Sequence, residues 1–233
     1  MQKEKKLIIV GSGETAEIAY EYFTYDSVYA VEAFSVSKSY MEKERMQFGV
    51  PIVPFEELEL LYPPDRYETY VAISYGHLNR DRTKMYLKCK EKGFMCASYI
   101  SSHSFFWHSA EIGENSFIFE NNTIQHGVCI GNNVTLWSGN HIGHRTVIED
   151  NVWLTSHCVV SGYCHIGRNS FLGVNSTLGD HVILGEDSVL GAGSLTVHSL
   201  PEKGKIYIGC PARAVEGTSY DKFNIKTEKN YLL

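Results

Sequence analysis

The sequence lacks long apolar runs, clusters of basic residues, and any cysteine spacing typical of metal or redox sites. Its N-terminus, MQKEKKLIIVGSG, has only four consecutive apolar residues before Gly11, too few for a signal peptide or a membrane span. With a net charge of −6 and no basic patch, the chain is not expected to bind nucleic acid. Without a secretory signal, its cysteines are interpreted as thiols of a cytoplasmic protein. These are Cys89, Cys96, Cys129, Cys158, Cys164 and Cys210.

What the sequence does contain is a repeat of six residues. From Ala110 to Thr196 an aliphatic residue recurs at every sixth position without interruption. A period of six matches neither the 3.6 of a helix nor the 2 of an ordinary strand. Repeats this short indicate a parallel β-solenoid, in which stacked neighbours complete the core. The positions are Ile112, Ile118, Ile124, Ile130, Leu136, Ile142, Ile148, Leu154, Val160, Ile166, Leu172, Leu178, Leu184 and Leu190.

Two further positions of the repeat have a characteristic composition. A mostly small residue lies two places before each aliphatic one, and glycine follows eight of the aliphatic residues. We predict that the aliphatic side chains point into a triangular prism and that the small residues turn its corners. The glycines are expected to provide backbone angles that side chains resist. Four glycines share an eighteen-residue spacing that Glu149 interrupts once, so eighteen residues make one coil. Side chains eighteen residues apart should then stack about 4.8 Å from one another.

The first hundred residues alternate between strand and helix patterns. We predict strands over residues 5–10, 29–36, 50–53, 67–74 and 96–100, and helices over 14–23, 55–61 and 79–93. The last helix should carry its Lys and Arg residues on a solvated outer face. This order implies a parallel sheet flanked by helices. Such a sheet binds ligands beyond the carboxyl ends of its strands, here near Gly11, Ser12, Gly13 and Gly76. The glycine turn precedes a helix whose N-terminus can hold a phosphate.

Three segments follow from these patterns. Residues 1–103 are predicted to form a small Rossmann-like α/β domain, residues 104–216 a parallel β-helix, and residues 217–233 a tail or short helix. The stretch Gly209-Cys-Pro-Ala-Arg213 is expected to cap the prism, because an uncovered coil would expose unpaired strand edges.

Residues 5 to 216 resemble the bacterial hexapeptide-repeat sugar acetyltransferases, which act on nucleotide-linked amino sugars or on sialic acid. The matching stretches are Ile142-Gly-His144-Arg-Thr-Val-Ile-Glu-Asp150, Ile166-Gly-Arg-Asn-Ser-Phe-Leu-Gly-Val-Asn-Ser176 and Gly209-Cys-Pro-Ala-Arg213. The resemblance implies a nucleotide-sugar-binding α/β domain, a left-handed β-helix and a cytoplasmic homotrimer that uses acetyl-CoA and no metal.

The resemblance places His144 on the family's catalytic histidine, a general base at the interface between two prisms. A sugar amine or hydroxyl must lose a proton as it attacks the thioester, and imidazole titrates near neutrality. In relatives an acidic residue often follows this histidine and orients it, whereas Arg145 occupies that place here. We therefore expect Glu149 or Asp150 to orient the ring.

The resemblance also implies a path for coenzyme A along the side of the prism. The residues expected to contact it are Gly162, Gly173, Asn175, Ala192, Pro211 and Arg213. Trp137 and Trp153 fall on outward positions, where they could stack on adenine or a sugar or be buried against a neighbouring prism. We count Trp153 among the cofactor residues.

For the nucleotide sugar, we expect contacts from Gly11, Ser12, Gly13, Ser35 and Gly76. His126 lies eighteen residues before His144 and should stack on the same edge. It either lines the cleft or is a surface imidazole.

The predicted reaction is acetylation of the amino group of a nucleotide-linked amino-deoxy sugar in glycan synthesis. Transfer to a sugar hydroxyl is the main alternative. His141, His144, His157 and His165 also suggest a metalloenzyme resembling the γ-class carbonic anhydrases, although they do not reproduce its ligand spacing. A non-catalytic trimeric scaffold is the remaining alternative.

Overall fold

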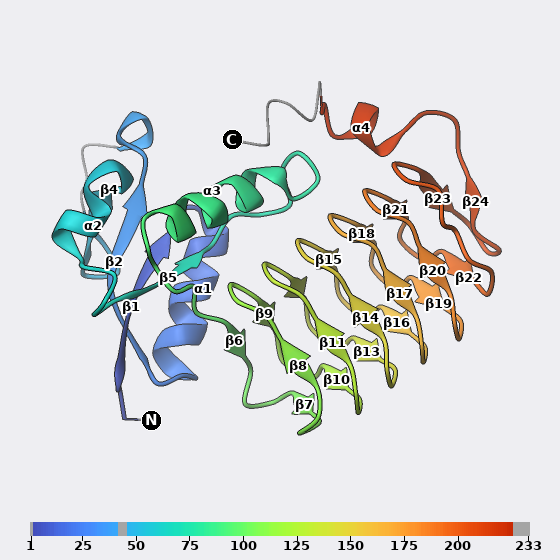
Figure 1. Ribbon diagram of the computed structural model, residues 1–233, viewed down its shortest axis with the longest axis horizontal. Helices are drawn as coiled ribbons and strands as arrows, with labels where there is room; N and C mark the ends of the chain where they lie inside the picture. The colour runs from blue at the N-terminus through green and yellow to red at the C-terminus, as the bar shows by residue number, and fades with distance from the viewer. Residues whose placement is uncertain (1, 42–45, 226–233) are drawn as a thin grey trace.

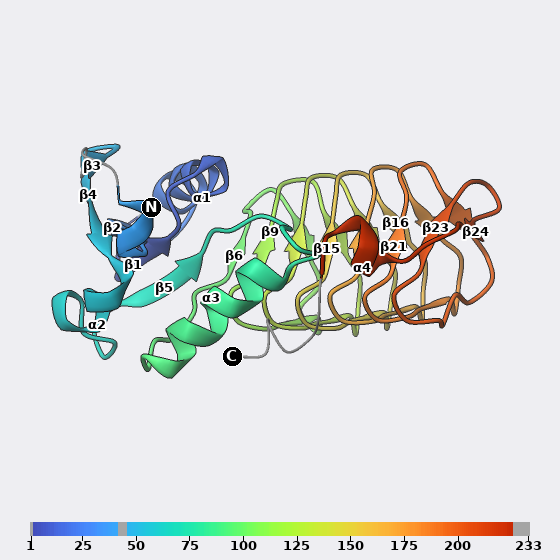
Figure 2. The same ribbon diagram turned by 90° about the horizontal axis from the view of Figure 1, so that it is seen from above.

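The computed structural model describes residues 2–41 and 46–225, which form an α/β unit and a three-sided column (Figure 1). The α/β unit lies at the N-terminal end of the column, and α3 extends from it along the column's side (Figure 2). This arrangement confirms the predicted fold class of a small parallel α/β unit followed by a left-handed parallel β-helix.

The α/β unit contains a five-stranded sheet in the order β3-β4-β2-β1-β5, parallel except for the β3–β4 pair. Successive residues of β1 alternate between its two faces. Leu7 and Ile9 pack with Phe23 of α1, whereas Ile8 and Val10 pack with Leu58 of α2. The strands are β1 (Lys5–Val10), β2 (Tyr29–Val36), β3 (Met46–Gln47), β4 (Val50–Pro54) and β5 (Glu68–Val71). The helices are α1 (Glu14–Tyr25), α2 (Leu58–Leu61) and α3 (Arg80–Glu91), with 3-10 turns η1 (Lys38–Tyr40) and η2 (Phe55–Glu57).

The column is a prism whose three faces are the remaining sheets, and equivalent strands of successive coils pair in parallel at an eighteen-residue offset. The first face contains β6 (Tyr99–Ile100), β9 (Phe117–Ile118), β12 (Thr135–Leu136), β15 (Trp153–Leu154), β18 (Phe171–Leu172), β21 (Val189–Leu190), β23 (Ile206–Ile208) and β24 (Arg213–Ala214). The second face contains β7 (Phe105–Phe106), β10 (Thr123–Ile124), β13 (His141–Ile142), β16 (Val159–Val160), β19 (Thr177–Leu178) and β22 (Leu195–Thr196). The third face contains β8 (Glu111–Ile112), β11 (Cys129–Ile130), β14 (Val147–Ile148), β17 (His165–Ile166) and β20 (Ile183–Leu184).

The chain turns at three corners in each coil. We call the corner between the first and second faces the first corner, that between the second and third faces the second corner, and that between the third and first faces the third corner. The predicted aliphatic residues form the prism's core, with Ile112 only partly buried. The small residues that precede them also point inward, as Val128, Val152 and Cys158 do, so both registers fill the interior.

The expected role of the repeat glycines is wrong. None of the eight glycines that follow an aliphatic residue has a positive φ. Instead, a Cβ on Gly143 would lie 2.5 Å from the Gly162 nitrogen of the next coil, and one on Gly167 would lie 2.6 Å from that of Glu186. These glycines permit the close approach of successive coils. The left-handed backbone occurs two residues later, often at asparagine, which tolerates it better than most residues do.

The predicted strand over residues 96–100 does not complete the α/β sheet. Cys96 makes only an isolated bridge with Thr69, whereas Tyr99–Ile100 pairs with β9 as the first rung of the prism. Ile100 and Phe106 continue the six-residue register backwards from Ile112 and pack against the prism's core. The stacking therefore begins before residue 104.

At the other end of the prism, the chain turns through Gly209 to Pro211, and β24 pairs antiparallel with β23 at the edge of the first face. The helix α4 (Ser219–Lys222) follows and begins with a capping box between Thr218 and Asp221. It lies on the same side of the prism as α3 (Figure 2). Residues 226–233 of the predicted tail lie outside the described residues.

The arginines of α3 are not on a solvated face, contrary to the prediction. Arg82 is 1% exposed and donates to Asn133 Oδ1 and O at 2.9 and 3.0 Å. Arg80 Nη2 lies 2.8 Å from Asp187 Oδ1. These contacts dock α3 on the third corner, where five residues with φ of 53 to 63° recur every eighteen positions. They are Asn115, Asn133, Asn151, Asn169 and Asp187.

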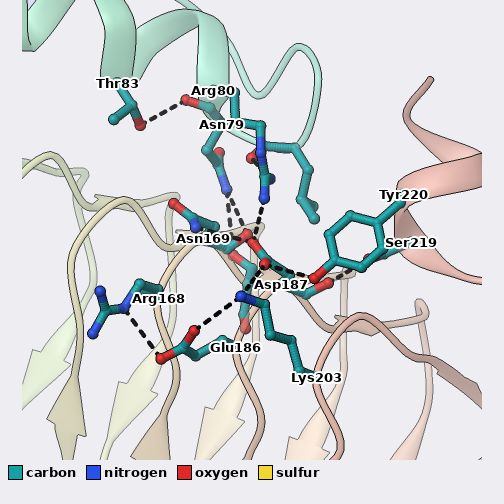
Figure 3. Close-up of polar contacts among 12 residues, drawn as sticks. Asn79, Arg80, Thr83, Arg168, Asn169, Glu186, Asp187, Lys203, Ser219 and Tyr220 are labelled. Atoms are coloured by element: carbon teal, nitrogen blue, oxygen red, sulfur yellow. Dashed lines mark hydrogen bonds and ion pairs between the residues drawn. The ribbon is translucent and has the colours of Figure 1, made fainter. Parts of the chain in front are cut away.

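Asp187 joins three parts of the chain at this corner (Figure 3). Its carboxylate accepts hydrogen bonds from Arg80 of α3, from Asn169 of the coil before, and from the Tyr220 hydroxyl of α4 at 2.9 Å. The Ser219 hydroxyl donates to the Asp187 carbonyl oxygen. The α/β unit, the prism and α4 therefore share one buried carboxylate.

Candidate functional site

His144 lies at the second corner, between β13 and β14, and Gln125 of the preceding coil holds it. The His144 main-chain N–H donates to Gln125 Oε1 at 2.9 Å, and Nδ1 of the ring lies 3.3 Å from the same oxygen. Among the described residues, no hydrogen bond involves the ring's other nitrogen, Nε2. One edge of the imidazole is therefore anchored and the other is open to react.

Neighbouring coils complete a slot around the half-buried ring. The His126 ring stacks 6.4 Å away at an interplanar angle of 3°, and the Tyr163 ring meets it edge-on at 5.1 Å. On the following coil, a Cβ at Gly162 would lie 2.5 Å from His144 Cε1. The predicted stacking of His126 on His144 is confirmed, and the absent side chain of Gly162 leaves room for the ring.

The prediction that Glu149 or Asp150 orients His144 is wrong. Glu149 accepts hydrogen bonds from His165 Nε2 at 2.6 Å and from the Arg168 N–H, and Asp150 accepts one from the Asn132 N–H. Both acidic residues follow β14, which carries the chain from the second corner to the third. Partial burial alone would raise the pKa of Glu149, but these hydrogen bonds hold it below its ordinary value.

The residues predicted to contact the cofactor lie at separate places on the prism. Gly162 is at the second corner beside His144, whereas Gly173, Asn175 and Ala192 are at the first corner. Pro211 and Arg213 are exposed at the C-terminal end of the first face. The second face separates the two corners, so one chain does not bring these residues together.

Trp153 is not available to coenzyme A on this surface. Its side chain is 3% exposed, with the Arg82 guanidinium 4.9 Å from its ring and the Tyr75 ring 5.4 Å away. Trp137 stacks on Phe119 at 4.5 Å and packs against the core of the α/β unit. Both tryptophans therefore pack within one chain, because its own α/β unit covers this face.

A cavity of about 730 Å³ lies at the carboxyl ends of β1, β2 and β5. Gly11, Ser12, Gly13 and Ser35 line it, as predicted for substrate residues, whereas Gly76 does not. Gly11 has a φ of +124°, and a Cβ there would lie 2.7 Å from the Ala72 carbonyl oxygen. Glycine is thus required for the sharp turn into α1.

Two features of this cavity suit an anionic, polar ligand. No side chain caps the N-terminus of α1, so main-chain N–H groups of its first turn remain available to an anion. The Ser35 hydroxyl is buried and has no hydrogen-bond partner within the described part of the chain. Ligand binding could satisfy it.

The sequence analysis missed three charged residues of this cavity: Glu14 at the start of α1, and the α3 pair Asp81 and Lys84. The three-residue spacing of Asp81 and Lys84 places them on one face of a helix, which was a usable signal. The helical pattern alone places the charges of this helix on a solvated face.

The four histidines of the metalloenzyme alternative do not converge. His141 lies on the second face, His144 at the second corner, His157 at the first corner and His165 on the third face. The described residues contain no group of three or more His, Cys, Asp or Glu arranged to hold a metal ion. Likewise, none of the described helices has the length and apolar character needed to cross a membrane.

Comparison with known proteins identifies the repeat and the fold. The model of the bacterial transferase hexapeptide (six repeats) family matches residues 109–144 and 163–197. No curated protein matches significantly.

Several solved structures match almost the whole chain. A mutant perosamine N-acetyltransferase from Caulobacter crescentus, in complex with CoA and GDP-perosamine, matches with a TM-score of 0.80 and 24% identity over 91% of this chain and 97% of that one. The acetyltransferase domain of PglB from Neisseria gonorrhoeae FA1090 gives 0.79 and 21%, over 91% and 100%. WeeI from Acinetobacter baumannii AYE gives 0.70 and 18%, over 91% and 100%. These likenesses establish a shared fold over both parts of the chain.

Proposed function

We propose that this chain, a hexapeptide-repeat protein with the fold of the sugar acetyltransferases, transfers an acetyl group from acetyl-CoA to the amino group of a nucleotide-linked amino-deoxy sugar. The observation that carries the proposal is the slot at the second corner, where Gln125 anchors the His144 ring and Gly162 makes room for it. The similar Caulobacter protein is named an N-acetyltransferase and was solved with CoA and GDP-perosamine, which favours acetyl-CoA and a nucleotide-linked amino sugar as the substrates here.

In the proposed reaction, His144 acts as general base. The amine nitrogen attacks the thioester carbonyl carbon, and Nε2 of His144 takes the proton that the nitrogen loses. The tetrahedral intermediate then collapses, breaking the bond between carbonyl carbon and sulfur. The products are the amide and coenzyme A, whose sulfur receives the proton from His144, so that the base returns to its neutral form. No covalent bond to the protein is needed.

The nucleotide sugar would bind in the cavity of the α/β unit. The N-terminus of α1 and the Lys84 side chain can hold its diphosphate, and the Ser35 hydroxyl can bond the base or ribose. Acetyl-CoA and nucleotide sugars are cytoplasmic metabolites, so we place the reaction in the cytoplasm.

We further propose a homotrimer in which the second corner of one chain faces the first corner of another. His144 and Gly162 would then share a groove with Gly173, Asn175 and Ala192 of the neighbouring chain, which a single chain does not provide. Exposed apolar residues on the second and third faces support such packing: Val159 is 39% exposed, Val147 36% and Ile183 45%.

The test is to mix the purified protein with acetyl-CoA and UDP-, dTDP- or GDP-linked amino sugars, and to measure free thiol. We expect free thiol to be released only when both substrates are present. The nucleotide sugar should become heavier by one acetyl group. The matching hydroxy sugars, run in parallel, test transfer to oxygen. An absence of both turnover and ligand binding across the panel would refute the proposal and favour a scaffold.

A further inference from the structure

The hydrogen bonds around His144 determine the orientation of the Gln125 amide. A main-chain N–H can only donate, so the side-chain atom 2.9 Å from the His144 nitrogen must be an acceptor. This identifies the atom as Oε1 and not Nε2 of Gln125, an assignment that otherwise depends on the surrounding network. The Gln125 main chain is itself fixed, because its N–H donates to the Ile142 carbonyl oxygen in the β-ladder.

The amide orientation in turn determines the tautomer of the imidazole. Nδ1 of His144 faces the same Gln125 Oε1 at 3.3 Å. Because that oxygen only accepts, Nδ1 must carry the hydrogen, and in the neutral ring the lone pair is then on Nε2. The nitrogen that can accept a proton from a substrate is therefore the one with no hydrogen bond within the described chain.

Gln125 also leaves the ring without a carboxylate partner. The groups that face the imidazole are the rings of His126 and Tyr163, with the exposed Arg145 next in the chain. The nearest carboxylate along this corner, Asp180, is one coil beyond Gly162 and accepts the Gly162 N–H at 2.9 Å. A carboxylate in contact with the ring would favour its charged form, whereas a neutral amide oxygen does so far less.

We infer that Gln125 is the positioning residue of the proposed reaction: it holds His144 in the Nδ1–H tautomer and so leaves the Nε2 lone pair free to accept a proton from the substrate. The inference rests on the proposed function for its effect on rate. Its structural part, the tautomer, is independent of that function.

Two variants at one position separate geometry from charge. Gln125→Glu keeps an acceptor oxygen and adds a negative charge, whereas Gln125→Met keeps the length and removes the acceptor. We expect Gln125→Met to lower kcat about ten- to a hundredfold with little change in either KM, because the base loses its orientation. Gln125→Glu should retain kcat at high pH and move the acidic limb of the kcat/KM profile upward by about one pH unit.

Nitrogen-15 NMR of labelled histidine reads the tautomer directly, with His144→Ala identifying the signal. The wild type should show the Nδ1–H form of His144, Gln125→Met a mixture, and Gln125→Glu the Nδ1–H form with a higher titration midpoint. An Nε2–H ring in the wild type, or a tautomer unchanged in Gln125→Met, overturns the inference. If the NMR results hold but no variant or wild type transfers acetyl groups, the proposed function fails while the positioning by Gln125 stands.

Discussion

The His144 ring lies against Gly162 so closely that a Cβ on this glycine would come within 2.5 Å of Cε1. Gly162 has no positive φ, so its backbone accepts an alanine. Gly162→Ala should therefore displace the imidazole without unfolding the coil, and we expect turnover to fall about ten- to a hundredfold. Gly179→Ala is the matched control at the same corner, since the atoms nearest to its Cβ would belong to Val197, at 3.1 Å and beyond. Equal activity of the two variants would show that the slot does not constrain the base.

His144→Ala should reduce turnover by about two or more orders of magnitude, because the substrate then loses its proton acceptor. The binding of acetyl-CoA and the melting temperature should change little. His108→Ala is the control, since His108 is exposed and occupies the same corner two coils earlier. Steady-state kinetics on both variants distinguish these outcomes, and near-normal turnover of His144→Ala would remove this residue from the role of base.

Ser35→Ala should affect stability and substrate binding differently. Removing a buried hydroxyl that has no partner in the described chain should leave the melting temperature of the ligand-free protein unchanged or higher. Losing a hydrogen bond to the nucleotide should raise the KM for the nucleotide sugar about tenfold, with the KM for acetyl-CoA unchanged. Thr24→Ala provides the control, because the Thr24 hydroxyl is also buried and unpartnered within those residues but does not line the cavity. An unchanged KM in Ser35→Ala would mean that the nucleotide binds without this hydroxyl.

Asp187→Asn should destabilise the protein strongly, because it leaves the buried Arg80 guanidinium without a counter-charge. Removing one partner of a buried ion pair costs about 3 to 5 kcal/mol. Urea denaturation measures the loss, with Asp150→Asn as the control at an exposed carboxylate of the same corner. If Asp187→Asn lowers the free energy of unfolding no more than Asp150→Asn does, the ion pair contributes little to the docking of α3.

The same carboxylate predicts a pH dependence. Burial alone would raise the pKa of Asp187, but the charge of Arg80 and the hydrogen bonds from Arg80, Tyr220 and Asn169 hold it below the ordinary 3.8. A lowered folded-state pKa gives stability that is complete above the unfolded value and lost as the pH falls through the folded value. The protein should therefore lose stability below about pH 4. Tryptophan fluorescence can follow the loss, since Trp153 lies beneath Arg82, and this part of the pH dependence should be absent from Asp187→Asn.

Much of the fold could be predicted because the prism is periodic. Each inward aliphatic residue occupies one rung, so the six-residue register gave the rungs from Ile112 to Leu190 directly. The register also continues backwards to Phe106 and Ile100. Because Phe106 is aromatic and not aliphatic, the pattern did not reveal that the prism begins this early. The corner glycines were located correctly and explained incorrectly, since their role depends on the distance between coils and not on local dihedral angles.

The details of the site were harder to predict because they depend on which side chains face one another across coils. Glu149 follows His144 closely in sequence, yet a strand carries it to another corner. Gln125 precedes His144 by nineteen residues, one coil plus one position, which brings it into contact. The burial of Arg80 and Arg82 depends on a corner of the prism more than fifty residues away, and no pattern within α3 reveals that surface.

The docking of α3 also restricts how the chain could grow. In most solenoids a coil contacts only its neighbours, so whole coils can be gained or lost. Here Arg82 bonds to Asn133, Asn79 to Asn169 and Arg80 to Asp187. The start of α3 is thus bonded to residues that span four successive coils of the prism. One extra coil between Asn133 and Asp187 would shift the far contact by about 4.8 Å, more than a hydrogen bond can stretch. The length of the prism is thus fixed along this helix and free to vary only outside it.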